Sequence, residues 1–87
     1  MEMKILKQDK DEMEIELENL TIAEILRVYL NQDSSVSFAA WKRVHPTERP
    51  ILKVQTKGKS VKKALDDAVN SITKDLDKIL DDFKKIK

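Results

Sequence analysis

Four glutamates at alternate positions are the first residues of the chain that could do chemistry: Glu12, Glu14, Glu16 and Glu18. Alternate side chains of a strand lie on one face, so these carboxylates would be neighbours. Neighbouring carboxylates can bind a cation or serve as general acid and base. No histidine or cysteine accompanies them in this segment. We therefore interpret the row as the solvated face of a strand and predict no metal site.

His45 is the only histidine, and it would need an orienting acid and a nucleophile to act as a catalytic base. None of the serines stands in a recognisable nucleophile motif. The single glycine, Gly58, excludes the glycine-rich loops that hold nucleotide phosphates. The sequence therefore predicts no catalytic residue and no cofactor.

A cluster of lysines surrounds the start of the last predicted helix: Lys57, Lys59, Lys62 and Lys63. Two interpretations stay open, because such lysines can keep the surface solvated or contact a nucleic-acid phosphate at a helix N-terminus. The chain carries 17 basic and 16 acidic residues, and this net charge of +1 does not favour polyanion binding as its main task. We expect no direct sequence-specific binding of nucleic acid.

The composition is typical of a small cytoplasmic protein with one domain, residues 1–87. The absence of cysteine suits a reducing compartment. The first residues, Met1-Glu2-Met3-Lys4, lack the apolar region of a signal peptide. No apolar run approaches the roughly 18 residues of a membrane span, so we expect no membrane association.

The hydrophobic pattern predicts two kinds of element in the order ββαββα. The strands are expected at 3–7, 12–18, 36–45 and 51–57, and the helices at 21–31 and 60–87. Short polar turns join the strands in pairs, which is typical of antiparallel hairpins. The sequence therefore predicts an α+β fold, with a four-stranded, mainly antiparallel sheet and both helices on one face.

Local signals refine the middle of the chain. A capping box is expected to open the first helix, with Thr21 at the N-cap, Glu24 at N3, and Leu20 with Ile25 as a hydrophobic staple. Alternation along the third strand places its two aromatic residues on opposite faces. Phe38 is expected in the core, and Trp41 on a sheet face or at an interface.

The last third of the chain, residues 60–87, predicts a long amphipathic helix with Ser60 as its N-cap. Such a helix would measure about 40 Å at 1.5 Å per residue. The predicted strands measure only about 20–30 Å. The helix therefore extends past the sheet, and its distal apolar residues need another surface to cover them. This excess indicates a protein partner.

The run Phe38-Ala39-Ala40-Trp41-Lys42-Arg43-Val44-His45-Pro46 resembles a strand motif, Phe-x-Ala-Tyr-x-x-Pro-His-Pro, of archaeal RNA polymerase subunit L. That family is related to the eleventh subunit of eukaryotic polymerase II and to the dimerisation domain of the bacterial α subunit. Leu20-Thr21-Ile22-Ala23-Glu24 falls where the family has His-Thr-Leu-Gly-Asn. Thr56-Lys57-Gly58, which closes the fourth strand, is also similar, and the resemblance covers essentially the whole chain.

The resemblance implies a non-catalytic assembly subunit of DNA-directed RNA polymerase. Subunits of this kind pair with a larger D-type subunit through the two helices of each partner, and the pair supports the large catalytic subunits. The chain itself would contribute no magnesium ligand and no nucleotide contact. Its dimer interface is expected to comprise Ile22, Ile25, Leu26, Tyr29, Ile72, Leu76, Ile79, Leu80, Phe83 and Ile86.

A self-contained homodimeric α+β binding module is the alternative. Two copies could cover the same apolar stripe symmetrically, through an isologous four-helix contact. The residues alone do not separate this arrangement from a heterodimer, and only the resemblance favours the D-type partner. Whether the isolated chain is monomeric also stays open.

Overall fold

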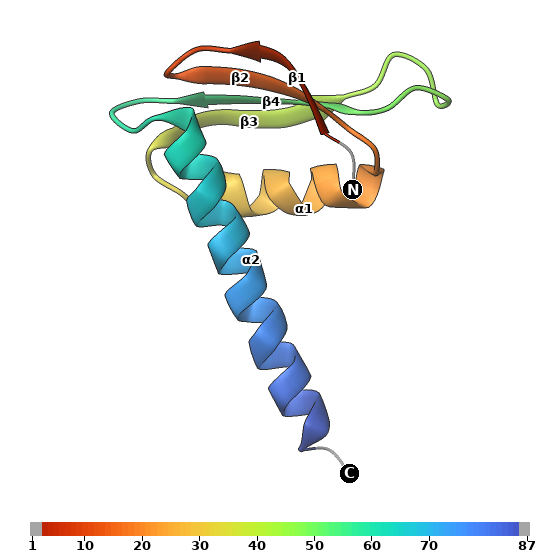
Figure 1. Ribbon diagram of the computed structural model, residues 1–87, viewed down its shortest axis with the longest axis vertical. Helices are drawn as coiled ribbons and strands as arrows, with labels where there is room; N and C mark the ends of the chain where they lie inside the picture. The colour runs from red at the N-terminus through yellow and green to blue at the C-terminus, as the bar shows by residue number, and fades with distance from the viewer. Residues whose placement is uncertain (1–2, 86–87) are drawn as a thin grey trace.

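A computed structural model describes residues 3–85, and the predicted element order is confirmed (Figure 1). The elements are β1 (Met3–Gln8), β2 (Glu12–Leu17), α1 (Leu20–Asn31), β3 (Val36–Lys42), β4 (Ile51–Thr56) and α2 (Val61–Lys84). Both helices lie on the same side of the sheet, and α2 then leaves it. The longest dimension of the molecule, 46 Å, runs from the sheet to the far end of α2.

The sheet is antiparallel throughout, in the order β1-β2-β4-β3. The alternation that predicted β2 is confirmed, because Met13, Ile15 and Leu17 are buried between half-buried glutamates. β4 alternates in the same way, with Leu52 and Val54 fully buried. These two strands are central in the sheet and therefore supply most of its apolar face.

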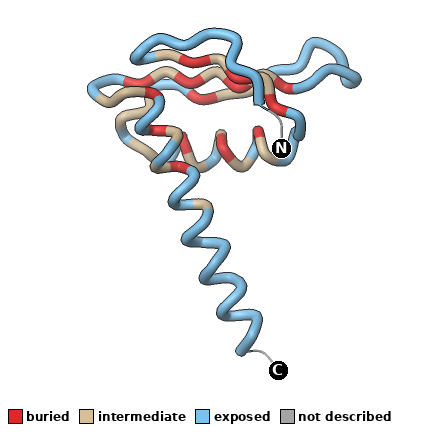
Figure 2. Tube along the Cα trace, in the orientation of Figure 1, coloured by how far each residue is buried: buried red, intermediate tan, exposed pale blue. Residues whose placement is uncertain are grey.

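The core lies between this face of the sheet, α1 and the first turns of α2 (Figure 2). α1 contributes Leu26 and Leu30, and it packs chiefly against β3. α2 contributes only small or β-branched side chains, Val61, Ala64 and Ala68. Ile72, one turn further on, is half-buried against the core, and the turns after it lie outside, so the first turns up to Ile72 anchor the helix.

β3 differs from its prediction in length and in orientation. It ends at Lys42 rather than His45, and the residues that follow form a loop in which the His45 carbonyl accepts a hydrogen bond from the Glu48 amide. Phe38 is 44% exposed, whereas the neighbouring Ala39 is buried. The pairing with β4 shifts register between Val36 and Phe38, and this irregularity turns Phe38 toward the open face of the sheet.

α1 begins two residues earlier than the predicted capping box allows. Asn19 is the N-cap, and its side-chain oxygen accepts hydrogen bonds from the amides of Thr21 and Ile22, at 2.7 and 3.4 Å. Thr21 is therefore inside the helix, and the carboxylate of Glu24 binds other side chains instead of capping. The predicted capping box and its staple are wrong, while the Ser60 cap of α2 is confirmed.

Asn19→Ala should lower the free energy of unfolding by about 1 kcal/mol, because it removes the only side-chain acceptor of the first-turn amides of α1 among the described residues. Urea denaturation followed by the fluorescence of Trp41 measures this change. Thr21→Ala is the matched control and should have a much smaller effect. Equal losses in the two variants would contradict the assignment of Asn19 as the cap.

Candidate protein-interaction surface

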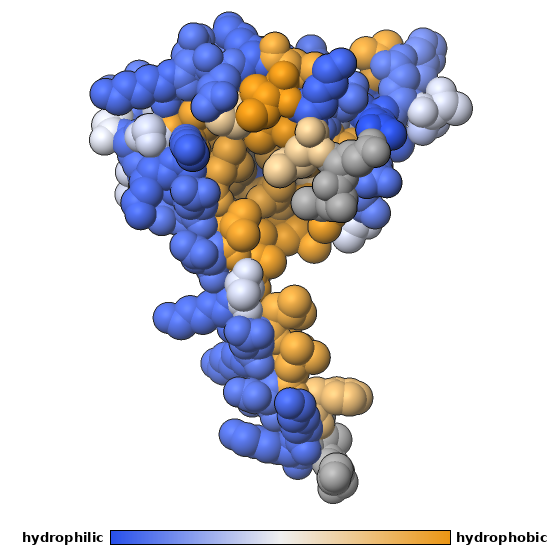
Figure 3. Space-filling model, viewed as in Figure 1, coloured by the Kyte–Doolittle hydropathy of each residue, from blue (hydrophilic) through white to orange (hydrophobic). Residues whose placement is uncertain are grey.

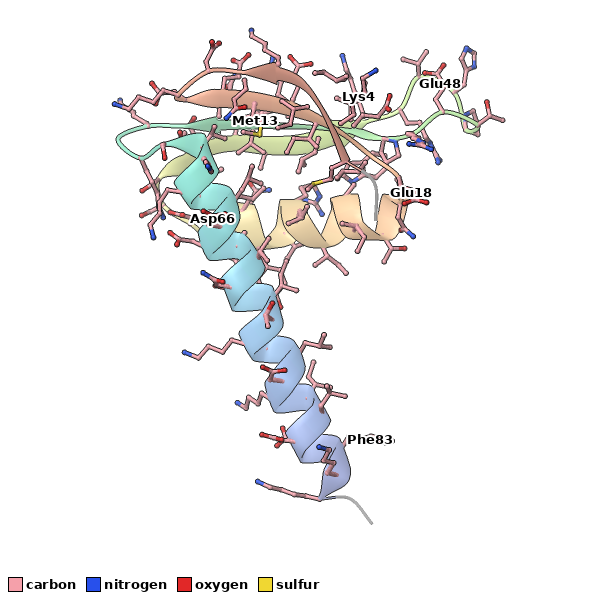
Figure 4. All side chains as sticks on the ribbon, viewed as in Figure 1. Lys4, Met13, Glu18, Glu48, Asp66 and Phe83 are labelled. Atoms are coloured by element: carbon pink, nitrogen blue, oxygen red, sulfur yellow. The ribbon has the colours of Figure 1, made fainter. Side chains whose placement is uncertain are left out.

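The distal part of α2 carries large apolar side chains that nothing in the described chain covers. Leu76, Ile79, Leu80 and Phe83 are 53%, 62%, 50% and 71% exposed. Figure 3 shows an apolar band that continues from beneath the sheet along one side of α2. Figure 4 places Phe83 at the far end of the helix, remote from Met13 in the core.

The residues of α1 that were predicted at the interface are less exposed than those on the distal part of α2. Ile22, Ile25 and Tyr29 are half-buried, and the Tyr29 hydroxyl donates a hydrogen bond to Asp75 of α2, at 2.8 Å. Leu26 is only 7% exposed and belongs to the core of the chain itself. A helical stripe alone does not distinguish a residue that packs on its own sheet from one that awaits a partner.

Ile72 is half-buried against the core and lies where α2 leaves the globular part of the chain. Ile86, also predicted at the interface, lies outside the described residues. The interface assignment as a whole stays a prediction, and the exposed α2 residues are its most accessible part.

A groove of about 330 Å³ extends the surface onto the sheet. Its apolar lining comes from β1, β2, α1 and α2: Met3, Ile5, Met13, Ile15, Leu26, Leu65 and Val69. Met3 and Ile5 are more than half exposed although they face the helices. Sequence reasoning missed the groove, and the alternation of Met3 and Ile5 in β1 was the available signal.

The base of α2 is held by a charged network. The Lys59 ammonium lies 2.7 Å from Asp33 Oδ2, before β3, and 2.6 Å from Asp67 Oδ2, within α2. These hydrogen bonds raise the pKa of Lys59 and lower the pKa of both carboxyl groups. Because the network joins α2 to the loop after α1, it helps to fix the direction in which α2 projects.

A second network fastens α1 to β3. Arg27 donates two hydrogen bonds to the Glu24 carboxylate, at 2.7 and 2.8 Å, and Trp41 Nε1 donates another at 3.0 Å. These hydrogen bonds lower the pKa of Glu24 to about 2, and those from Arg27 have a larger effect than the one from Trp41. Trp41 is half-buried against the core, so its indole anchors the sheet to α1.

We expect Glu24 to contribute to the acid sensitivity of the fold. Its pKa is depressed in the folded chain, so its contribution is present above its ordinary pKa of 4.5 and is lost as the pH falls toward 2. Urea midpoints measured by Trp41 fluorescence should therefore fall less steeply across this range in Glu24→Gln than in the unmodified chain. The control Glu48→Gln, whose side chain has no partner among residues 3–85, should keep the original slope.

The residues considered for other chemistry are dispersed or paired. Glu12 accepts hydrogen bonds from Lys7 and Gln55, each at 2.8 Å, as expected of a charged strand face. In the lysine cluster, Lys59 and Lys63 both pair with Asp67. Within residues 3–85, no group of three or more His, Cys, Asp or Glu side chains could hold a metal ion. None of the helices in that range has an apolar stretch long enough to cross a bilayer.

Comparison with known proteins identifies relatives along nearly the whole chain. A family model described as RNA polymerase Rpb3/Rpb11 dimerisation domain matches residues 11–82. DNA-directed RNA polymerase subunit Rpo11 of Sulfurisphaera tokodaii is 33% identical over 99% of this chain and 97% of its own length. The Rpo11 subunit of Pyrococcus horikoshii is 32% identical with the same coverage.

The fold has a counterpart among solved structures. The crystal structure of DNA-directed RNA polymerase subunit L from Thermoplasma acidophilum superposes with a TM-score of 0.84. The alignment covers 97% of this chain and 86% of that one, at 21% identity. At this identity the match supports the fold, including the long terminal helix, rather than individual contacts.

Proposed function

The chain belongs to the family of RNA polymerase Rpb3/Rpb11 dimerisation domains, and from that membership we propose that it is the partner of a D-type subunit. In this proposal the two proteins form a heterodimer in the cytoplasm, and the heterodimer is the platform on which the large catalytic subunits assemble. The chain acts through binding alone, and RNA synthesis is the activity of the whole polymerase.

One observation carries the proposal: the large apolar side chains on the distal part of α2 are at least half exposed. Fully burying a leucine, isoleucine or phenylalanine side chain is worth about 1.5–3 kcal/mol. A partner that covers several such side chains in one stripe would gain part of this energy at each of them, and this gain counts against the cost of association. The groove beside β1 adds apolar area that is continuous with the stripe.

Light scattering of the purified chain, alone and mixed with the D-type subunit of the same organism, tests the proposal. We expect a stable one-to-one complex in the mixture. A tight homodimer that does not exchange with the D-type subunit would contradict the proposal and favour the self-contained binding module. The homodimer stays an alternative because the exposed stripe could also be covered by a second copy.

A further inference from the structure

The apolar stripe of α2 has acidic borders. Successive residues of a helix are about 100° apart, and by this spacing Asp75, Asp77 and Asp82 lie roughly 90–110° from the centre of the stripe, at its edges. Asp75 and Asp77 flank Leu76, and Asp82 precedes Phe83. Asp66 follows Leu65 nearer the core, and it is labelled in Figure 4. Among the distal border residues, Lys84 is the only basic one.

The basic residues of this part of α2 lie mostly on its opposite side. Lys74, Lys78 and Lys85 are roughly 145–175° from the centre of the stripe by the same helical spacing. Asp81 lies among them on this back face. The charges are therefore sorted, with acids beside the apolar surface and most cations away from it.

The border carboxylates are available to a partner. Asp66, Asp77 and Asp82 are exposed and form no ion pair with any residue between 3 and 85. Asp75 accepts a hydrogen bond from Tyr29 and forms no ion pair within the same part of the chain. This differs from Asp67 at the base of α2, which is paired with Lys59 and Lys63.

We propose that the partner of this surface presents apolar helices bordered by lysine or arginine, and that the aspartate borders of α2 select it over a second copy of this chain. The inference rests on the proposed function and specifies the chemistry of the partner. Charges beside an apolar seam set the choice of partner between helices, because opposite charges attract and like charges repel.

A homodimer of this chain shows how the acidic borders would discriminate between partners. Two copies that cover each other's stripes bring borders together that are mostly acidic, because Lys84 is the one basic residue among the distal border residues. A basic-bordered partner turns the same positions into exposed ion pairs. The two kinds of complex therefore have opposite salt dependence, because added salt screens both attraction and repulsion.

The first experiment measures two dissociation constants between about 50 and 500 mM NaCl, a range over which screening changes strongly. The dissociation constant for the D-type subunit should rise about tenfold, and that for self-association should fall. Isothermal titration calorimetry measures the first and sedimentation equilibrium the second. A salt-independent heterodimer, or self-association that weakens with salt, would overturn the inference.

Charge reversals locate the effect on α2. Asp77→Lys and Asp82→Lys should each weaken binding to the D-type subunit about fivefold, the upper range for an exposed ion pair. Asp81→Lys carries the same charge change on the back face and should alter binding less than about twofold. Equal losses of affinity in all three variants would overturn the assignment to the borders. Circular dichroism checks that each variant is folded.

Failure of the two proposals can be distinguished. If the unmodified chain does not bind the D-type subunit at any salt concentration, the proposed function is wrong. The self-association measurements then test the proposed repulsion between acidic borders by themselves. If self-association does not become tighter as salt is added, that repulsion is absent and the inference is wrong. If the subunit binds but the reversals at 77 and 82 have no effect, the function stands and the charge selection is wrong.

Discussion

Leu76→Glu should abolish pairing with the D-type subunit while leaving the isolated chain as stable as before. Leu76 is 53% exposed in the single chain, so the substitution removes little of its own packing. In the complex the same position would hold an unpaired carboxylate between apolar surfaces, in addition to losing the burial of the leucine. Together these effects exceed about 3 kcal/mol, which weakens binding more than about 100-fold.

Calorimetric titration of the D-type subunit with the variant measures this loss. Lys78→Gln is the matched control, because it makes the same change in net charge on the back face of α2 and should leave the affinity nearly unchanged. Phe83→Glu should cause the same loss of binding, because Phe83 lies on the same stripe two helical turns after Leu76. Binding retained by both Leu76→Glu and Phe83→Glu would mean that the distal part of α2 is not the interface.

Leu52→Ala should lower the free energy of unfolding of the chain by about 2–5 kcal/mol. Leu52 is 0% exposed and lies on the central strand β4, paired with Ile15 of β2 and Trp41 of β3. Its truncation leaves a cavity that the surrounding sheet cannot fill by a local shift. Since small domains are stable by only about 5–15 kcal/mol, part of the population should unfold at moderate temperature.

Urea denaturation of the isolated chain, with Trp41 as the fluorescent probe, measures the change. Leu80→Ala is the control, because it deletes the same atoms at a position that is 50% exposed. It should change the stability of the isolated chain by less than about 0.5 kcal/mol. Comparable losses in the two variants would place Leu80 in the core and contradict the description of α2.

The periodicity of the sequence predicts most of this fold because each face of β2, β4 and α2 has a distinct polarity. Met13, Ile15 and Leu17 are buried as their alternation predicts, and the four-and-three spacing of α2 places its apolar residues on one side. Where one face is apolar and the other charged, a register error would bury charge. The pattern therefore specifies the structure strongly.

β3 and the start of α1 were mispredicted because their signals are degenerate. Phe38, Ala39, Ala40 and Trp41 give no polar alternation, so the pairing with β4, and not the pattern, decides which of them faces the core. Asn19 and Thr21 are both good N-caps two residues apart, and the choice depends on how the chain leaves β2. Tertiary geometry settles both cases.

The candidate interaction surface was predicted in part. Leu76 and Phe83 could be placed on it because α2 is too long for the sheet. Leu26 could not be assigned, since a broad apolar stripe on α1 serves both the core and the surface. The β1 wall of the groove, with Met3 and Ile5, was missed because it depends on the strand order, which adjacent hairpins do not determine.

Every residue from Thr73 to Lys84 is exposed, and beyond the hydrogen bond between Tyr29 and Asp75 no buried side chain holds this end of α2 in helical form. Isolated helical segments shorter than about 12–15 residues are marginal in water. In an unassembled copy, we expect this apolar segment to unwind repeatedly and become a good substrate for proteases, whereas a bound partner would protect it. Degradation would then remove surplus copies selectively, and the cell would keep this subunit in proportion to its partner.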